Sequence, residues 1–293
     1  MSAETQNPAR QHAAGATMVL AATLLFSLGG LAVRLVEADD GWAIVAYRSG
    51  GACLAIFLYV LATQGLRAPS AFRAVGGIGL IGAAGLAAAF SGYVQALQYT
   101  TVAGTLIVLA AGPVVAAGFA RLWLAERIEP ATAAAVAAAI FGVAVMSVDG
   151  LRDGAWLGIA FALAATIGSS IYLTVVRRQR HMDMTPSFCV GAGMASLLAF
   201  TLAGDLQIGA RDTLLCLAMG AIQVGFAALL YVRGARLVPA VEVALIALLE
   251  IVFGTLWVWL ALGETPTTAT FIGGAVVLAA VIGQTLAQAR SGQ

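Results

Sequence analysis

The feature that most constrains this chain is a series of long apolar segments separated only by short polar breaks. A helix that spans a membrane needs roughly 20 mainly apolar residues. We expect ten such spans, at residues 15–36, 42–63, 74–96, 101–123, 130–149, 154–176, 184–204, 213–235, 239–262 and 267–289. Because the connections are short, little is left for a soluble domain. The sequence therefore predicts an all-α polytopic membrane protein whose function resides within the membrane.

Composition supports a membrane protein and argues against several other classes. Of the 293 residues 61% are hydrophobic and 10% are charged, whereas soluble domains carry about 25% charged residues. The net charge of +1 offers no basic excess for nucleic acid. Cys53, Cys189 and Cys216 lie in apolar segments without CxxC pairing, so neither a disulfide framework nor a zinc site is indicated. We expect no cofactor and no metal.

The distribution of arginine predicts the orientation in the membrane. If the N-terminus is cytoplasmic, the inner side receives eleven arginines and the outer side only Arg152 and Arg211. Arg34 and Arg48 fall inside predicted spans. Cytoplasmic loops of membrane proteins carry an excess of basic residues. We therefore expect both termini to be cytoplasmic.

An internal repeat divides the chain into two halves. A shift of 138 residues aligns "GYVQALQYT" at 92 with "LYVRGARLV" at 230, so that Tyr93 meets Tyr231, and it aligns Glu126 with Glu264. We expect two repeats of five helices, at 1–150 and 151–293. Five is odd, so the halves should enter the membrane from opposite sides. Such inverted repeats are common in secondary transporters, whose substrate sites lie near the midplane between the repeats.

Two related runs carry a family resemblance. "GPVVAAGFARLWLAER" at 112–127 and "LEIVFGTLWVWLALGE" at 249–264 resemble the EamA-type members of the drug/metabolite transporter superfamily. The resemblance covers essentially the whole chain and implies small-molecule transport. The chain is most similar there to the amino-acid exporters, including exporters of aromatic amino acids. Ala125 replaces the usual Gly before Glu126, and Ile251 replaces the Pro that commonly follows Glu250, which predicts a straighter ninth helix.

Two charged residues within the spans are candidates for the substrate site. Glu250 lies in the middle of the ninth span, where a central acid costs about 2.5–3.5 kcal/mol of insertion free energy that the surrounding apolar residues outweigh. It either faces a wet cavity, where it binds an amino group or titrates, or is a structural carboxyl. Arg48 could clamp a substrate carboxylate, pair with Glu250 or extend to the surface. Arg34 lies beside Glu37 and Asp39, which favours a surface ion pair.

Tyrosines and uncharged polar residues complete the candidates. Tyr93 and Tyr231 could act as alternating gates or belong to an interfacial aromatic belt. Other polar groups on the spans either line a cavity or join helices by hydrogen bonds: Tyr47, Ser91, Gln95, Ser169, Tyr172 and Gln223. The glycine row at 76, 79, 82 and 85 is typical of close helix packing.

These patterns favour a secondary transporter that exports amino acids, or similar small neutral or zwitterionic metabolites, across a bacterial inner membrane by alternating access. Its partners would be the small-molecule substrate and the lipid bilayer. Proton exchange and uniport are both compatible with these patterns as modes of transport. The alternatives are a facilitator for nucleotide sugars or cationic drugs, and a membrane subunit that does not transport. We do not expect an enzyme, since both histidines, His12 and His181, lie in loops and so leave an intramembrane serine without a base.

Overall fold

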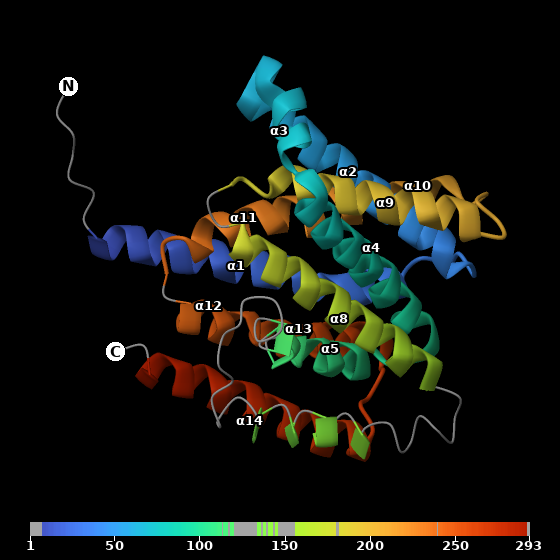
Figure 1. The fold of residues 1–293 in the computed structure, drawn as a ribbon. Helices are drawn as coiled ribbons and strands as arrows, with labels where there is room; N and C mark the ends of the chain where they lie inside the picture. The colour runs from blue at the N-terminus through green and yellow to red at the C-terminus, as the bar shows by residue number, and fades with distance from the viewer. Residues whose placement is uncertain are drawn as a thin grey trace.

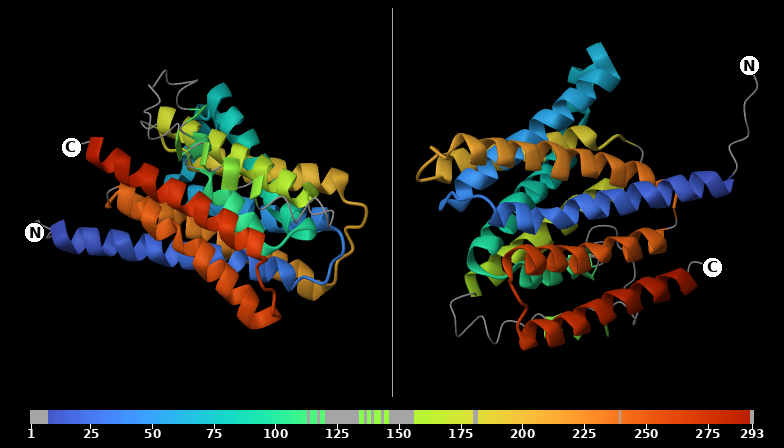
Figure 2. Two further views of the ribbon diagram at one scale, coloured as in Figure 1. Left: turned by 90° about the horizontal axis from the view of Figure 1, so that it is seen from below. Right: turned by 180° about the vertical axis from the view of Figure 1, so that it is seen from behind.

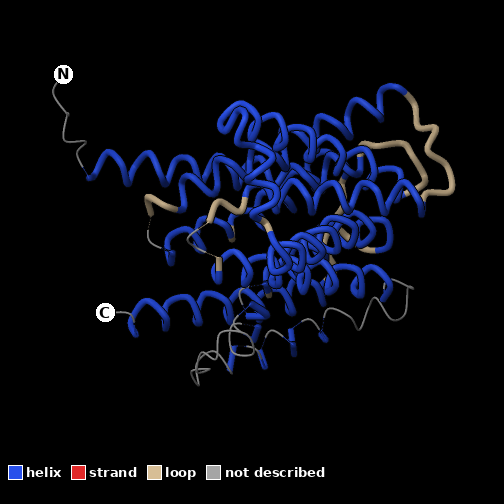
Figure 3. The backbone as a smooth tube through the Cα atoms, turned by 45° about the horizontal axis from the view of Figure 1, so that its top comes forward, coloured by secondary structure: helices blue, strands red, loops and turns tan. Residues whose placement is uncertain are grey.

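The structure, a computed structural model, is helical wherever it has regular elements (Figure 3). It describes residues 8–112, 114–116, 118–119, 134–135, 137–138, 140–142, 144–145, 156–179, 182–238 and 240–291. Helices are expected because no water is available in a bilayer to hydrogen-bond an exposed backbone. The predicted fifth span, 130–149, lies largely outside the described residues.

Within 8–112 and within 156–291, as far as the structure describes them, the helices follow one another with short connections (Figure 1). Before residue 150 they are α1 (Pro8–Arg34), α2 (Gly41–Gln64), the 3₁₀ turn η1 (Gly65–Arg67), α3 (Ala68–Ala74), α4 (Gly76–Tyr99) and α5 (Val102–Ala110). After it they are α8 (Trp156–Arg178), α9 (Thr185–Leu202), α10 (Ala210–Ala218), the π-helical segment η2 (Met219–Phe226), α11 (Ala227–Ala235), α12 (Ala240–Ala247), α13 (Leu249–Leu262) and α14 (Thr268–Ser291).

Six helices in the described part of the chain are long and apolar enough to cross a membrane: Arg10–Arg34, Gly41–Ala74, Gly76–Tyr99, Trp156–Arg178, Thr185–Leu202 and Ala210–Ala235. Three shorter apolar helices accompany them, at Val102–Ala116, Leu249–Leu262 and Thr268–Gly283. Leucines on the outside of the bundle, such as Leu197 and Leu214, are 69% and 70% exposed, as side chains facing lipid would be. The chain is therefore a multi-pass membrane protein; the count of ten spans stays a prediction.

Helices from the two sides of residue 150 pack directly on each other. In the views of Figures 1 and 2 the long helices lie side by side, with α4 against α8 and α9, α2 against α9 and η2, and α1 against α11 and α13. The start of α1 and the end of α14 lie at the same end of the bundle. This arrangement is expected if both termini lie on one side of the membrane. That this side is the cytoplasmic one stays a prediction.

Glycines let α4 and α8 approach closely. A Cβ atom on Gly168 would overlap the backbone carbonyl oxygen of Gly85, and one on Gly82 would lie 3.0 Å from the side chain of Val175. Small residues at such crossings favour van der Waals packing between membrane helices. The predicted role of the glycine row in packing is thus confirmed for these positions.

The ninth helix is not one continuous α-helix, and its expected straightness relative to other family members stays a prediction. The predicted span 239–262 is divided into α12 and α13 at Leu248, two residues before Glu250. The carbonyl oxygen of Leu248 accepts a hydrogen bond from the backbone N–H of Ile251 at 3.2 Å, which is the tighter i→i+3 pattern of a 3₁₀ turn. A local change of hydrogen bonding therefore interrupts this helix without the proline that usually marks such a break.

Candidate functional site

A buried arginine lies where four helices meet. Arg48 of α2 is only 4% exposed, and its Nη2 donates to Oε1 of Gln223 in η2 at 3.3 Å. The guanidinium carbon lies 5.3 Å from the ring centre of Tyr93 and 5.7 Å from that of Phe90, both on α4. The amide nitrogen of Gln223 in turn donates to the carbonyl oxygen of Phe26 in α1 at 3.2 Å. Residues far apart in sequence are thus joined around one charge.

Three glycines make this convergence possible. A Cβ atom on Gly220 would overlap the backbone carbonyl oxygen of Arg48, and one on Gly51 would overlap that of Leu217, so α2 lies against the α10–η2 helix backbone to backbone. A Cβ atom on Gly29 of α1 would lie 2.8 Å from Nε2 of Gln223 and 3.0 Å from the Tyr93 hydroxyl. Gln223 sits inside the π-helical turn, a local widening that is frequent at functional sites.

The charge of Arg48 is not balanced within the described residues. No carboxylate of the described residues lies within 4 Å of the guanidinium, so Arg48 forms no ion pair there. Its Nε atom also lacks a hydrogen-bond acceptor. The two aromatic rings attract the cation by about 0.5–2 kcal/mol each, whereas an unpaired charge inside a membrane is expensive. The site therefore favours an anionic group that would approach the guanidinium.

Glu250 forms no ion pair with Arg48, but its charge acts on Tyr93, which also lies against Arg48. Glu250 is in the first turn of α13 and is half-buried, and no ion pair or hydrogen bond is formed with it in the described part of the chain. Tyr93 lies within range of the charges of both Arg48 and Glu250, and Tyr231 within range of that of Glu250. The direct Arg48–Glu250 pair considered from the sequence is not formed, and Arg48 points to Gln223 rather than to the surface.

The two candidate gate tyrosines come from α4 and α11. Tyr93 is buried on α4, while Tyr231 of α11 is partly exposed and packs edge-on against Phe26 with ring centres 6.3 Å apart. Both contact residues that also surround Gln223. Their role as gates stays a prediction.

The remaining candidates divide between the site and its surroundings. Ser91 and Gln95 are buried on α4, next to Phe90 and two residues after Tyr93 respectively, and Oγ of Ser91 and Nε2 of Gln95 have no hydrogen-bond partner in the described chain. The Tyr47 hydroxyl donates to the carbonyl oxygen of Leu206 at 2.9 Å, which ties α2 to the 203–209 loop. Tyr47 therefore supports the fold beside the site.

Ser169 and Tyr172 of α8 lie away from Arg48. Ser169 is exposed and donates to the carbonyl oxygen of Thr166 in its own helix at 3.0 Å. The Tyr172 ring packs against Phe188 with centres 6.1 Å apart, and its hydroxyl donates to the Met184 carbonyl at 3.5 Å. These are contacts within and between helices.

Sequence reasoning missed three participants: Gly29, Phe90 and the carbonyl of Phe26. A glycine or phenylalanine in an apolar span carries no polar signal, and only the fold shows that they adjoin Arg48 and Gln223. A surface recess lined by Thr63, Gln64, Leu66 and Arg67 lies at the end of α2 and includes none of the candidate residues.

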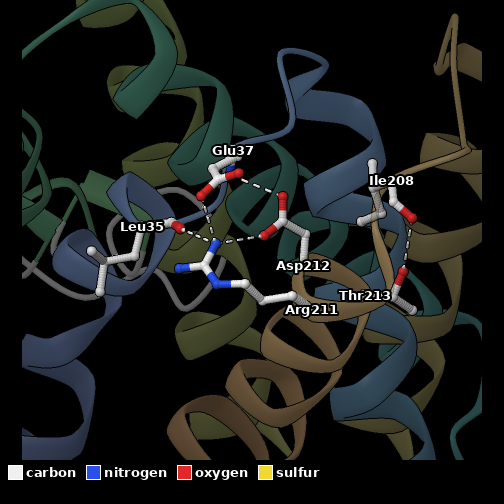
Figure 4. Close-up of polar contacts among 6 residues, drawn as sticks. All are labelled: Leu35, Glu37, Ile208, Arg211, Asp212 and Thr213. Carbon is white, nitrogen blue, oxygen red and sulfur yellow. Dashed lines mark hydrogen bonds and ion pairs between the residues drawn. The ribbon is translucent and has the colours of Figure 1, made fainter.

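Polar contacts tie the helices together at the end of the bundle where α1 ends and α2 begins (Figure 4). Nη1 of Arg211 donates to the Leu35 carbonyl at 3.3 Å, to Glu37 at 3.2 Å and to Asp212 at 3.1 Å. The Asp212 carboxylate also accepts from the backbone N–H of Glu37 at 2.9 Å. The 35–40 loop is therefore held to the start of α10.

Two further residues strengthen this end. Asp40 caps α2 by accepting from the backbone N–H of Trp42 at 2.8 Å, and it also accepts from that of Gly204 at 2.7 Å. Arg34 pairs with Glu264 at 3.3 Å, so the expected surface pair of Arg34 with Glu37 or Asp39 is wrong. The other carboxylate oxygen of Glu264 accepts from the N–H of Val102 at 2.8 Å, which ties the segment after α13 to the start of α5.

Comparison with known proteins identifies the kind of membrane protein that carries this site. The EamA-like transporter family matches the chain twice, at residues 13–148 and 156–286. An uncharacterized transporter of Archaeoglobus fulgidus is 28% identical over 195 residues, which are 65% of this chain and 69% of that protein. A protein crystal structure superposes with a TM-score of 0.64 at 23% identity, covering 94% of this chain and 98% of the other, which shows a shared fold.

Proposed function

The chain belongs to the EamA-like transporter family, and from this premise we propose that it exports amino acids, aromatic ones included, or similar small zwitterionic metabolites. As a membrane transporter it works on a small-molecule substrate in a lipid bilayer, and family membership indicates transport rather than catalysis. The observation that carries the proposed specificity is the buried Arg48, which has no carboxylate partner in the described chain, with Glu250 nearby.

The chemistry of the site suits a molecule with one carboxylate and one ammonium group. The free Nε edge of Arg48 would donate to the carboxylate, and Glu250 would accept the ammonium group. Phe90 and Tyr93 offer aromatic faces beside the guanidinium, and Tyr93 also lies within range of the Glu250 charge. A transported zwitterion would thus supply both counter-charges that this structure lacks within hydrogen-bonding distance.

The alternative substrates fit less well. A nucleotide sugar carries a diphosphate, which several cations would have to balance, whereas the described interior of the bundle offers Arg48 alone beside Gln223. A cationic drug would be attracted by Glu250 and repelled by Arg48. The zwitterion therefore remains the favoured cargo.

We further propose that transport proceeds by alternating access of two repeats, 1–150 and 151–293. The two matches to one family, one on each side of residue 150, support this division. Packing of α4 on α8 and of α2 on α9 provides an extended contact between the repeats. Localisation in a bacterial inner membrane belongs to the proposal; the archaeal relative is compatible with any plasma membrane.

Counterflow into proteoliposomes tests the function. Vesicles preloaded with one unlabelled amino acid at a time should accumulate the labelled form only if they contain the protein. Arg48→Gln should abolish accumulation, while Arg233→Gln, at an exposed arginine hydrogen-bonded to Tyr59, should retain it. Counterflow of no amino acid above empty vesicles would reject this substrate class and favour a subunit without transport or another cargo.

Glu250→Gln distinguishes proton exchange from uniport. Because Glu250 would also accept the ammonium group, the variant should need more substrate for counterflow; at saturating substrate a proton-coupled carrier should show counterflow that no longer responds to an imposed pH gradient, since the glutamine cannot bind the coupled proton. A wild-type protein that ignores the gradient is a uniporter. A variant that responds like the wild type excludes Glu250 as the coupling group.

A further inference from the structure

Two cysteines from different repeats lie side by side. Sγ of Cys53 in α2 and Sγ of Cys189 in α9 are 3.7 Å apart, and the Cys189 thiol also lies 3.5 Å from the carbonyl oxygen of Cys53. They are 136 positions apart in sequence. Cys216, buried on α10, has no sulfur neighbour among the described residues. The chain thus holds one thiol pair and one isolated thiol.

The surroundings of the pair are apolar and open toward lipid. Cys53 and Cys189 belong to a cluster with Ile56, Val60 and Phe188. Cys53 is itself only partly buried, and Leu54 and Leu58, which flank it along α2, are 56% and 54% exposed. A reagent that reaches these thiols therefore approaches through the bilayer.

We propose that Cys53 and Cys189 are an oxidisable dithiol that closes to an intramolecular disulfide between α2 and α9. The sulfurs of a disulfide lie about 2.05 Å apart, an approach that rotation of the two side chains supplies. The two S–H bonds break and one S–S bond forms. The two electrons and two protons pass to a lipid-soluble oxidant of the quinone class, which is reduced to the hydroquinone.

The bond would join the two repeats covalently. Because α2 lies before residue 150 and α9 after it, the disulfide restricts movement of one repeat against the other. The effect of the disulfide on transport rests on the proposed alternating access, whereas formation of the disulfide itself does not. Oxidation would then slow transport and a reductant would restore it.

The test of the chemistry uses the full chain with Cys216→Ser, so that only the pair remains. Diamide, which accepts the same two electrons and two protons, is added to protein in lipid nanodiscs, and free thiols are counted by maleimide labelling after denaturation. We expect both thiols to disappear, a cross-linked peptide that joins residues 53 and 189, and a monomer on a non-reducing gel. Persistent free thiols, or a bond between two chains, would overturn the proposal.

Single variants provide the matched controls. Cys53→Ser and Cys189→Ser, each combined with Cys216→Ser, should keep their one remaining thiol free under the same treatment, since serine preserves the size of the side chain. Loss of that thiol as well would show that oxidation does not need the pair, and would contradict the assignment.

Counterflow with unmodified cysteines tests the consequence. Oxidised protein should lose most of its counterflow and regain it with dithiothreitol, while Cys53→Ser should be insensitive to diamide. Full counterflow by protein whose disulfide is verified by mass would overturn the regulatory consequence. If the disulfide forms in the oxidised protein but neither the oxidised nor the reduced protein shows counterflow, the result would count against the proposed function. The proposal of an oxidisable dithiol would still stand.

Discussion

At the scale of single residues, Arg48 is held by an uncharged partner where a charged one would fit. Its hydrogen bond runs to the amide oxygen of Gln223, which leaves the positive charge unneutralised, whereas a carboxylate at that position would form an ion pair with the guanidinium. Holding the guanidinium with an amide orients the side chain and leaves its charge free for a substrate.

Gln223→Glu tests this interpretation. The new carboxylate should pair with Arg48 but cannot donate to the Phe26 carbonyl, so thermal unfolding should show a smaller loss of stability than in Gln223→Leu, while amino-acid counterflow should fall because the guanidinium is neutralised. Gln223→Leu, by contrast, should destabilise the protein by about 1–3 kcal/mol, because it leaves a buried donor unsatisfied. Wild-type counterflow by Gln223→Glu would show that the positive charge of Arg48 is not used.

Asp40 provides a residue-scale test outside the membrane-spanning helices. Partial burial raises the pKa of its carboxyl group. Hydrogen bonds from the backbone N–H groups of Trp42, Gly204 and Asp205 lower the pKa and together outweigh the effect of burial, so that the pKa lies below its ordinary value. The stability that these bonds contribute is present above the unfolded pKa of about 3.9. It is lost as the pH falls through the lower folded pKa.

We therefore expect Asp40→Asn to flatten the acid limb of the stability profile, measured by unfolding between neutral and acidic pH. Asparagine caps a helix as well as aspartate does, whereas Asp40→Ala should cost about 1 kcal/mol more at neutral pH through loss of the cap. An acid limb that is identical in Asp40→Asn and wild type would contradict the assigned role.

At the scale of elements, the close approach of α2 and η2 positions Arg48. We expect Gly220→Ala to destabilise the protein by about 1–3 kcal/mol, because the added methyl group would overlap the Arg48 carbonyl oxygen. Gly77→Ala on α4 is the matched control: nothing lies within 4 Å of the added atom, so thermal unfolding should change little. Equal effects of the two substitutions would refute the tight packing at Gly220.

The long helices were predictable from the sequence and their irregularities were not. Sustained hydrophobicity gave the bounds of α1, α2, α4, α8 and α9 to within a few residues, apart from the start of α1. The break at Leu248 and the π-helical turn around Gln223 arise from a change of backbone hydrogen-bond partner. Neither has a proline to mark it, so the sequence gives no sign of either irregularity.

The members of the candidate site could be selected from sequence, but their contacts could not. Arg48 and Gln223 stand out as polar groups in apolar spans, yet 175 positions separate them and no pattern pairs them. Likewise Arg34 has acidic neighbours in sequence and binds Glu264 instead. Electrostatic partners are chosen by proximity in the fold, which hydropathy and spacing do not reveal.

At the scale of the whole molecule, the opposite insertion of the two repeats is testable by labelling. In a cysteine-free background, Leu66→Cys, at a fully exposed position after α2, should react with an impermeant maleimide only from the cytoplasm. Gly209→Cys, where an added side chain meets nothing within 4 Å, should react only from outside. These positions follow the second and the seventh predicted spans, so labelling of both from one side would mean parallel repeats.

The central claim is that Arg48 binds the carboxylate of the substrate, and equilibrium binding tests it most directly. Wild-type protein should bind the amino acid identified by counterflow at least about tenfold more tightly than its carboxamide, because a hydrogen bond to a charged group contributes about 1.5–3 kcal/mol. Folded Arg48→Gln should bind the two equally, and Arg233→Gln should discriminate as the wild type does. Undiminished preference for the carboxylate in Arg48→Gln would contradict the account.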